Sequence, residues 1–327
     1  IYMKQLHFVK SALLAMSACV IAGMAQAQSF PDRPITLVVP NPPGGLVDTS
    51  ARLLSEPLAR VIGQPVVVDN KPGASGNTAY QYVAKSKPDG YTLLISYSGY
   101  HVANPALMDK LQWDPIKDFS PIALLTVSTN VIAVHPSVPV NNLKELIAYA
   151  KANPGKLNYA SQGNGSVSHI GTEMFKQSTG TDMVHVPYKG SPEAIQDTMS
   201  GRTAFYMAPL DTAIGQLKGG KVRALGVTSK ARNAAVPDIP SIAELGYANF
   251  EIGLWFGVWA PAGTPAAIVK KINQDINLAM QSPEVKTAYE TKGIKATPMT
   301  PPEFTKFVRD EMAKYQKIAK DANMEPQ

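Results

Sequence analysis

Short β-branched runs alternate along this chain with loops rich in Gly and Pro and with segments whose apolar residues recur at helical spacing. Residues 35–39 are apolar and predict a strand, whereas residues 47–61 carry leucines and valines on one face and predict a helix. Strands that alternate with helices are typical of parallel sheets with helices on both faces. The same pattern predicts further strands at 65–69, 91–95, 131–134, 157–160, 184–186, 203–207, 222–227 and 255–259. It predicts further helices that end at Ala84 and that span 143–152, 169–178, 192–199, 211–217, 265–280, 283–292 and 302–322.

The repeated pattern divides the chain into two units. It becomes irregular near residues 118–125 and then starts again, so each unit is expected to form its own doubly wound α/β domain. The terminal helices have no strands of their own and are expected to return to the first unit. We therefore predict domain 1 at 28–125 plus 256–327 and domain 2 at 126–255, with crossings near 118–128 and 250–260. Two covalent crossings favour a hinge over a loose tether.

The N-terminal segment has the pattern of a targeting signal. Lys4 and Lys10 precede an apolar run over residues 11–24, and Ala25-Gln26-Ala27 follows it. A basic start, a short apolar run and an A-x-A site predict a secretory signal peptide over residues 1–27, cleaved after Ala27, and hence a periplasmic protein. Cys19 lies in a loose match to a lipoprotein cleavage box, so a lipid anchor stays open as an alternative.

Composition excludes several classes of protein. Of the 327 residues, 45% are hydrophobic and 17% are charged, which is too apolar for a disordered chain. The single cysteine excludes a disulfide framework and any multi-thiolate metal site, and the five scattered histidines form no metal-ligand pattern. The formal charge of +6 comes without a Lys/Arg run of the nucleic-acid-binding kind. We therefore expect no metal, no cofactor and no nucleic acid.

A Pro- and Gly-rich loop, Asn41-Pro42-Pro43-Gly44-Gly45, links the first predicted strand to the first long helix. In open α/β sheets, ligands bind beyond the carboxyl ends of the strands, and the free N–H groups of a helix start attract an anion. Asp48 falls in the first turn of that helix. The loop is thus a candidate anion site. A helix start punctuated by Pro and Gly, with Asp48 serving only the helix dipole, is an equal alternative.

The second unit repeats this design between a strand and a helix. Ser161, Gly163, Gly165 and Ser166 supply hydroxyl groups and flexible backbone at a helix start, which favours anion binding. The glycines match only the beginning of a dinucleotide motif. Ser166 with His169 also leaves open a serine hydrolase, although no G-x-S-x-G elbow occurs in the sequence. Two such loops, one per domain, suit a small carboxylate held between the domains.

These motifs, in this order, resemble the Bug family, the extracytoplasmic solute-binding proteins of tripartite tricarboxylate transporters. The resemblance covers the chain after residue 27 and rests on Pro42-Pro43-Gly44-Gly45 with Asp48 and Ala51-Arg52, on Asp69-Asn70 with Gly73-Ala74, and on residues 89–93, 104–107, 159–169, 186–190, 223–225, 227–229, 255–257 and 260–265. It implies a two-domain Venus-flytrap fold of the periplasmic-binding-protein type, with a ligand carboxylate held in the cleft by backbone N–H groups, hydroxyls and water. It also implies delivery of the ligand to a large and a small integral membrane subunit.

Carried over by position, the resemblance assigns a first cradle to Pro43, Gly44, Gly45 and Asp48, and a second cradle to Ser161, Gly163, Gly165, Ser166 and His169, with Tyr188 and Lys189 nearby. We expect the rest of the ligand to contact Asn41, Tyr97, Ser98, His101 and Ser128. Two departures from the family pattern bear on the ligand: Asn41 replaces an aromatic or small residue, and Ala208-Pro209 replaces an Asp-Asn pair that would meet an amine. The second departure disfavours amino acids and favours a dicarboxylate, with an aromatic one suited to Tyr97 and Tyr100.

The sequence therefore predicts a monomeric periplasmic solute-binding protein and no enzyme. It would capture a small carboxylate in an interdomain cleft by domain closure and deliver it to a tripartite membrane transporter. Two alternatives stay open, namely an exported serine hydrolase of a small ester or amide and a ligand-sensing partner of a membrane signalling protein.

Overall fold

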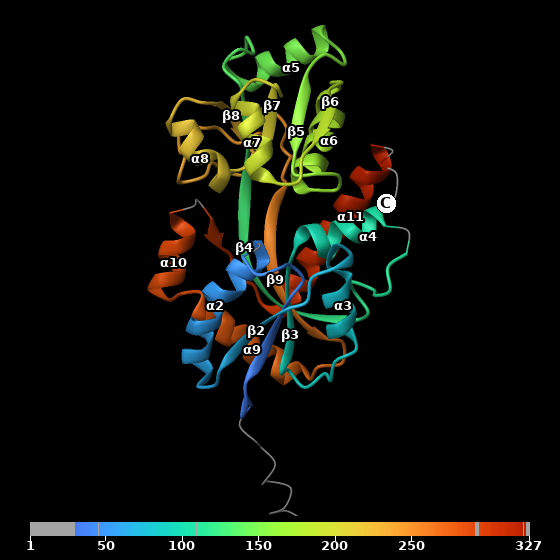
Figure 1. Ribbon diagram of the computed structural model, residues 1–327, viewed down its shortest axis with the longest axis vertical. Helices are drawn as coiled ribbons and strands as arrows, with labels where there is room; N and C mark the ends of the chain where they lie inside the picture. The colour runs from blue at the N-terminus through green and yellow to red at the C-terminus, as the bar shows by residue number, and fades with distance from the viewer. Residues whose placement is uncertain (1–29, 45, 109, 292–293, 323, 325–327) are drawn as a thin grey trace, which may run out of the picture.

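The computed structural model describes residues 30–44, 46–108, 110–291, 294–322 and 324. The predicted signal peptide, with Cys19 and the cleavage position after Ala27, lies outside the described residues, as does Gly45. Two lobes, one above the other in Figure 1, are joined by two long strands. No helix within the described ranges is both long and apolar enough to span a bilayer.

The first lobe, at the bottom of Figure 1, contains a parallel group of strands and the C-terminal helices. Strand β1 (Ile35–Val39) pairs with β2 (Val66–Asn70) and with β3 (Thr92–Tyr97). The other elements of this lobe are α2 (Leu46–Ile62), η1 (Ala74–Gly76), α3 (Asn77–Ala84), η2 (Gly99–Ala103), α4 (Asn104–Leu107), α9 (Ala266–Ala279), α10 (Pro283–Glu290), β10 (Lys295–Ala296) and α11 (Pro301–Asp321). Because α9 packs against α2, the C-terminal part of the chain lies in the same lobe as the N-terminal part.

Two long antiparallel strands connect the lobes. Strand β4 (Phe119–Val134) pairs with β9 (Gly253–Pro261) as far as Thr129, and with β7 (Phe205–Pro209) from Asn130 onward. The prediction of an irregular segment followed by a separate strand is therefore wrong, since one strand of 16 residues runs through both. Irregular pairing around Pro121 and between Leu124 and Thr126 breaks the simple alternation that identifies a strand in a sequence.

The sheets are mixed, whereas the alternation of strands and helices indicated parallel sheets. Strand β9 runs antiparallel to β3 in the first lobe, and β4 runs antiparallel to β7 and to β8 (Arg223–Val227) in the second. The parallel strands of each lobe end at the side that faces the other lobe. A strand that enters a lobe from that side must therefore run antiparallel to them.

The second lobe contains another parallel group, in which β5 (Asn158–Ser161) pairs with β6 (Val184–Pro187) and with β7. Its helices are α5 (Leu143–Ala152), α6 (Val167–Thr179), α7 (Ser191–Met199) and α8 (Leu210–Lys218). Helix α5 begins at Asn142, whose side chain accepts a hydrogen bond from the Glu145 amide at 2.9 Å. The predicted domain boundaries, after residues 125 and 255, fall inside β4 and β9 and stay predictions.

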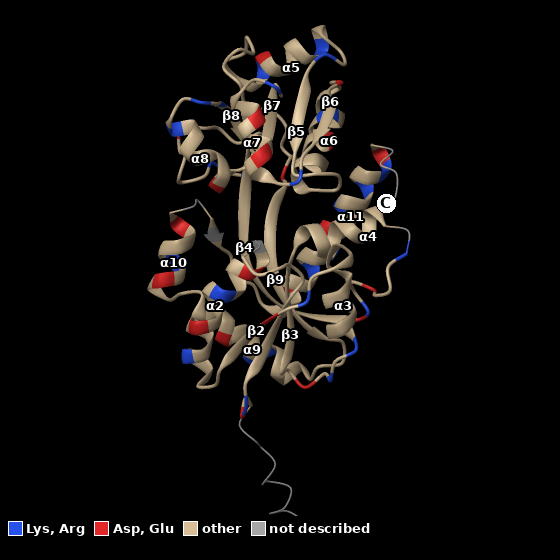
Figure 2. Cartoon of the chain, in the orientation of Figure 1, with Lys and Arg blue, Asp and Glu red and all other residues tan. Residues whose placement is uncertain are grey.

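Charged residues are spread over both lobes. Figure 2 shows Lys and Arg interspersed with Asp and Glu rather than gathered on one element. Such a mixture produces no extended field of one sign, which is the electrostatic feature that nucleic-acid-binding surfaces have.

Candidate functional site

The two predicted loops follow strands that end at the boundary between the lobes. The first loop, residues 41–45, links β1 to α2, and the second loop, residues 162–166, links β5 to α6. In the second loop, Gly165 lies against Leu107 of the first lobe. Just after the first loop, the first turns of α2 line a cavity together with Asp211 of the second lobe. Both loops therefore lie where groups from the two lobes meet.

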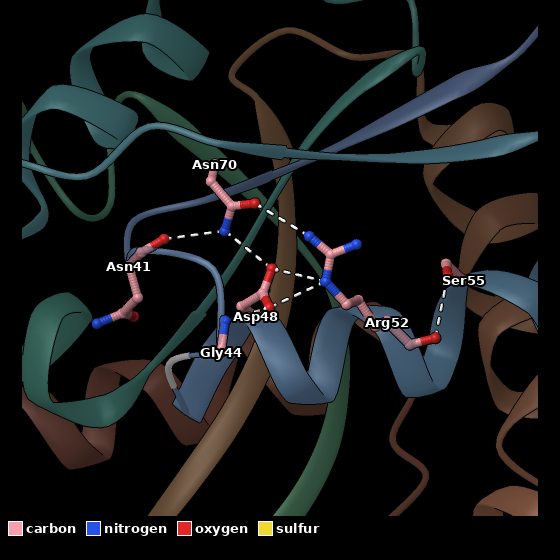
Figure 3. Close-up of polar contacts among 6 residues, drawn as sticks. All are labelled: Asn41, Gly44, Asp48, Arg52, Ser55 and Asn70. Carbon is pink, nitrogen blue, oxygen red and sulfur yellow. Dashed lines mark hydrogen bonds and ion pairs between the residues drawn. The ribbon is translucent and has the colours of Figure 1, made fainter.

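Asp48 organises the first loop from inside (Figure 3). It is 1% exposed, and its carboxylate accepts hydrogen bonds from the Gly44 amide at 2.8 Å, Arg52 Nε at 2.9 Å and Asn70 Nδ2 at 2.9 Å. These bonds, that of Arg52 foremost, lower the pKa of Asp48 to about 2 against the opposing effect of burial. Because its oxygens already have protein donors, Asp48 acts as a positioning residue, and it leaves Pro43 and Gly44 exposed.

Asn70 ties the end of β2 to the first loop. Its Nδ2 also donates to the Asn41 carbonyl oxygen at 2.9 Å, and its Oδ1 accepts from Arg52 Nη2 at 3.3 Å. Asn41 Nδ2 donates to the Tyr100 hydroxyl at 3.5 Å, while Asn41 Oδ1 is buried without a hydrogen-bond partner among the described residues. Sequence reasoning assigned no role to Arg52 and Asn70. The i, i+4 spacing of Asp48 and Arg52 was the available signal for their ion pair.

Tyr97 and Tyr100 form an aromatic wall beside the first loop. Their ring centroids lie 4.7 Å apart, and the ring of Tyr97 lies 6.3 Å from that of Phe256 in β9. Gly76 allows the close approach of Tyr100, because a Cβ at position 76 would lie 2.6 Å from its ring. Both tyrosines are partly exposed, so Tyr97, the predicted ligand contact, and its neighbour Tyr100 lie at a surface.

Ser98 and His101 lie in the core instead, contrary to the prediction that they contact the ligand. Both have 0% exposed surface. Ser98 Oγ accepts a hydrogen bond from the Trp255 amide at 3.5 Å, and the His101 ring stacks on Trp259 at 4.1 Å. The π-helical turn η2, directly after β3, rotates position 101 into the aromatic core, and no spacing rule in the sequence indicated that turn. We leave both residues out of the proposed site.

Most amides of the second loop already have acceptors within the protein. Gly163 donates its N–H to Ser161 Oγ at 3.0 Å, and Gly165 donates its N–H to His169 Nδ1 at 3.1 Å. Ser166 caps α6, where its hydroxyl donates to the Gly163 carbonyl at 2.6 Å and accepts from the His169 amide at 3.3 Å. The predicted residues therefore shape the loop. Within the described residues, the amides that lack a protein acceptor at this helix start are those of Asn164, Val167 and Ser168.

The stacked imidazole rings of His169 and His185 contact the second loop and support it. The rings of His169 and His185 lie 3.9 Å apart and nearly parallel, and that of Tyr159 lies 4.9 Å from His185. Burial lowers the pKa of His169 to about 3, helped by the neighbouring His185, and burial also lowers the pKa of His185. Both rings are therefore neutral at pH 7. The proton of neutral His169 lies on Nε2, because Nδ1 accepts the Gly165 amide.

The serine–histidine pair that the structure forms is not the one suggested for a hydrolase. Ser166 Oγ bonds backbone groups, and no bond joins it to the His169 ring among the described residues. His185 Nε2 instead lies 2.6 Å from Ser161 Oγ. Ser161 has 0% exposed surface, so its hydroxyl is closed to attack on a substrate in this arrangement.

Tyr188 and Lys189 follow β6 at the base of the second loop. The Tyr188 amide donates to the Ser161 carbonyl at 3.0 Å, and its hydroxyl donates to Asp197 Oδ2 at 2.9 Å. Burial, followed by the bond to Asp197, raises the pKa of Tyr188 to about 12. The side chain of Lys189 is exposed, and its amide donates to Glu193. Tyr188 is thus brought beside the second loop as a support.

Ser128 lies in a cavity of about 60 Å³ between the lobes. The lining comes from α2, β4, β9, α8 and α10 and includes Leu53, Ser128, Asp211, Phe256 and Tyr289. Sequence reasoning identified Ser128 alone of these. The others are up to 161 residues away along the chain from Ser128, so no local pattern indicated that they meet.

Comparison with known proteins agrees with this geometry. The family model described as "Tripartite tricarboxylate transporter family receptor" (TctC) matches residues 50–324. Protein BugT of Bordetella pertussis is 36% identical over 302 residues, which cover 92% of this chain and 93% of BugT. The structure of R. palustris Rpa4515 with adipate has a TM-score of 0.77 at 36% identity and covers 91% of this chain and 100% of that one. MatC from Rhodopseudomonas palustris with bound malate has a TM-score of 0.73 at 34% identity, with 88% and 99% covered.

The family match and BugT each span most of the chain, and the solved structures share its two-lobed α/β fold. The resemblance to the Bug proteins that the loop motifs indicated is thereby confirmed. The chain belongs to the TctC family of tripartite tricarboxylate transporter receptors and has the fold of their solute-binding proteins.

Proposed function

We propose that this protein is a periplasmic solute-binding protein that captures a small carboxylate between its lobes and passes it to the membrane subunits of a tripartite tricarboxylate transporter. Two related proteins have solved structures with adipate and with malate, so a dicarboxylate is the first candidate. The family description supports a transporter partner, and the signal-peptide pattern supports export. The observation that carries the proposal is that two helix-start loops, one from each lobe, both lie at the boundary between the lobes.

The start of α6 supplies the attraction for a carboxylate. The amides of Asn164, Val167 and Ser168 have no acceptor among the described residues, and they lie at the positive end of a 13-residue helix. Neutral His169 and His185 hold the loop in shape and add no charge. The first lobe contributes the exposed backbone at Pro43–Gly44 and the aromatic wall of Tyr97 and Tyr100.

The energetics of such a site are sufficient for uptake. A micromolar Kd corresponds to about −8 kcal/mol. A hydrogen bond to a charged group contributes about 1.5–3 kcal/mol, so a few amides and hydroxyls reach this range together with contacts to the rest of the ligand. Because those contacts come from both lobes, the ligand binds the closed arrangement better than an open one and drives closure.

A thermal-shift screen tests the proposal. Succinate, malate, adipate and phthalate at about 100 times Kd are expected to stabilise the protein by about 2.7 kcal/mol. For a chain of this size, that gain raises Tm by about 4 °C. Dimethyl succinate and sodium chloride at matched ionic strength are the controls and are expected to leave Tm unchanged. Stabilisation by none of a broad set of carboxylates would count against the proposal, and formation of succinate from the ester would favour the hydrolase.

Gly165 is expected to be sensitive to any side chain, because its φ is +73° and a Cβ would lie 2.7 Å from Leu107 Cδ1 across the lobe boundary. We predict that Gly165→Ala weakens carboxylate binding about tenfold, since the methyl group holds the lobes apart. Isothermal titration calorimetry with the acid selected by the screen measures the loss.

The matched control is Gly180→Ala, whose φ is +63° and whose Cβ would meet nothing within 4 Å. It carries the same left-handed strain without the contact and is expected to bind as the wild type does. The double variant Gly165→Ala/Leu107→Ala is expected to recover most of the affinity. Wild-type affinity of Gly165→Ala alone would show that the lobes do not need this contact.

A further inference from the structure

The cavity around Ser128 belongs to both lobes at once. Leu53 lies on α2 and Tyr289 lies on α10, both in the first lobe. Ser128 and Phe256 lie on the two connecting strands, and Asp211 lies on α8 of the second lobe. Its volume of about 60 Å³ holds a few atoms of the size of water. The cavity is therefore suited to one small group of a ligand held between the lobes.

The charge in this cavity is negative. Asp211 Oδ1 accepts hydrogen bonds from the Thr212 amide at 2.8 Å and the Thr212 hydroxyl at 3.4 Å, while its Oδ2 has no partner among the described residues. None of the described residues that line it is a Lys, Arg or His. A ligand carboxylate in this space would meet the Asp211 charge with no cation among the described lining residues to offset it.

The other described residues of the lining are uncharged. Leu53 and Phe256 are apolar, and Ser128 supplies a hydroxyl that is 2% exposed. Burial raises the pKa of Tyr289 to about 12, so its phenol stays neutral at physiological pH. A ligand group that enters therefore meets one acceptor with a full charge, lining residues that carry hydroxyl groups (Thr49, Ser50, Ser128 and Tyr289), and apolar side chains.

We propose that this cavity is a second subsite of the ligand and that it accepts a hydroxyl or ammonium substituent. This rests on the proposed function. The substituent donates to Asp211 Oδ2 and exchanges a hydrogen bond with Ser128, while the carboxylates of the ligand stay at the loops. The ligand class is then a hydroxy- or amino-substituted acid. The argument against amines drawn from Ala208-Pro209 loses its force, because Asp211 supplies an acidic group slightly further along the chain.

Isothermal titration calorimetry with matched acids tests the proposal. Succinate, malate and aspartate share one carbon chain and differ only in a hydrogen, a hydroxyl or an ammonium group; glutarate, 2-hydroxyglutarate and glutamate repeat the series with one more carbon. In the wild type, at least one substituted acid is expected to bind about tenfold or more tightly than the plain acid of its length. In Asp211→Asn, the preference for the ammonium-bearing acid is expected to fall about tenfold, because the charge that it pairs with is gone.

Asp238→Asn is the matched control, since Asp238 is an exposed residue of the same lobe and the substitution changes the net charge equally. It is expected to keep the wild-type preference. Ser128→Ala is the second variant and is expected to reduce the preference for the hydroxyl-bearing acid. Circular dichroism verifies the fold of each variant. Plain acids that bind as tightly as substituted ones at both lengths, or an unchanged preference in both variants, would overturn the subsite and leave carboxylate capture standing. Binding of no acid at all would overturn the proposed function and the subsite with it.

Discussion

The protein is expected to lose stability steeply as the pH falls below about 6.5, and a His101→Phe variant is expected to lose about 3 kcal/mol less by pH 4.5. Burial lowers the pKa of His101 to about 3, against a small opposing effect of the Pro115 backbone. Between about pH 3 and 6.5 the unfolded chain binds a proton at this position and the folded chain does not, so acid favours unfolding. Each pH unit in this window removes about 1.4 kcal/mol per group, or about 3 kcal/mol for His101 by pH 4.5.

Phenylalanine fits the surroundings of His101. The ring packs among Tyr80, Trp113, Phe119 and Trp259, and neither ring nitrogen has a well-formed hydrogen bond among the described residues. The substitution removes two buried polar atoms from an aromatic cluster, so at pH 7 it is expected to leave stability unchanged or raise it.

Urea unfolding of both proteins at intervals from pH 4.5 to 8.5 measures the effect. Above pH 7.5, where His101 is neutral in the folded and unfolded states, the two stability curves must run parallel, which provides the internal control. Below pH 6.5 the curves are expected to diverge, with the wild type falling faster. The pKa of His169 also lies at about 3, so its protonation lowers the free energy of unfolding of both proteins by the same amount. Parallel curves down to pH 4.5 would show that His101 is protonated in the folded state.

Asp48→Ala is expected to cost about 1–3 kcal/mol of stability and to weaken ligand binding, because it removes a buried acceptor whose partner Arg52 is 55% exposed. The change leaves the Gly44 amide and the Asn70 side-chain amide without their acceptor and frees the first loop. Asp48→Asn keeps the shape of the side chain but not its charge. Its stability and ligand affinity are expected to lie between those of the wild type and those of Asp48→Ala. Since the pKa of Asp48 is lowered to about 2, its contribution is present above about pH 4 and is lost as the pH falls toward 2.

Glu56→Ala, on the same helix, is the matched control for Asp48. Glu56 pairs with Arg60 at 3.1 Å in the same i, i+4 arrangement, but its side chain is 83% exposed. Exposed pairs of this kind contribute about 0.3–0.5 kcal/mol. Chemical unfolding and calorimetry with a stabilising acid compare the two variants. Equal effects of Asp48→Ala and Glu56→Ala would mean that the network around Asp48 does not organise the first loop.

The local features of this protein could be predicted from its sequence. The helix predicted at 47–61 is α2, Leu46–Ile62, because its apolar face and its Gly-rich start are encoded within one segment. The helix after the second loop is capped by Ser166, whose hydroxyl accepts a hydrogen bond from the His169 amide three residues later. Both loops were located for the same reason, since a Gly-rich connection between a strand and a helix is a short-range signal.

Features that depend on partners far apart in the chain were missed. Asp48 meets Asn70 over 22 residues and Ser161 meets His185 over 24, so nothing near either residue in sequence shows that its oxygens are occupied. His101 was placed at the ligand because it follows a strand, but its burial depends on Trp259, which belongs to a strand from the other end of the chain. The sequence indicated where the second loop lies, but it did not indicate which of its amides stay unpaired. That depends on side chains such as Ser161 and His169, which accept hydrogen bonds from the Gly163 and Gly165 amides.

The ladder of β4 has a mechanical consequence for any movement of one lobe against the other. Its pairing passes from β9 at Thr129 to β7 at Asn130 with no unpaired residue between them. A rotation of the lobes is therefore taken up as torsion of a hydrogen-bonded two-stranded ribbon rather than as free rotation at one flexible joint. The restoring force of such a ribbon grows with the angle and is shared along its length. In the proposed closure, the ligand would therefore work against an elastic element that returns the lobes when it leaves.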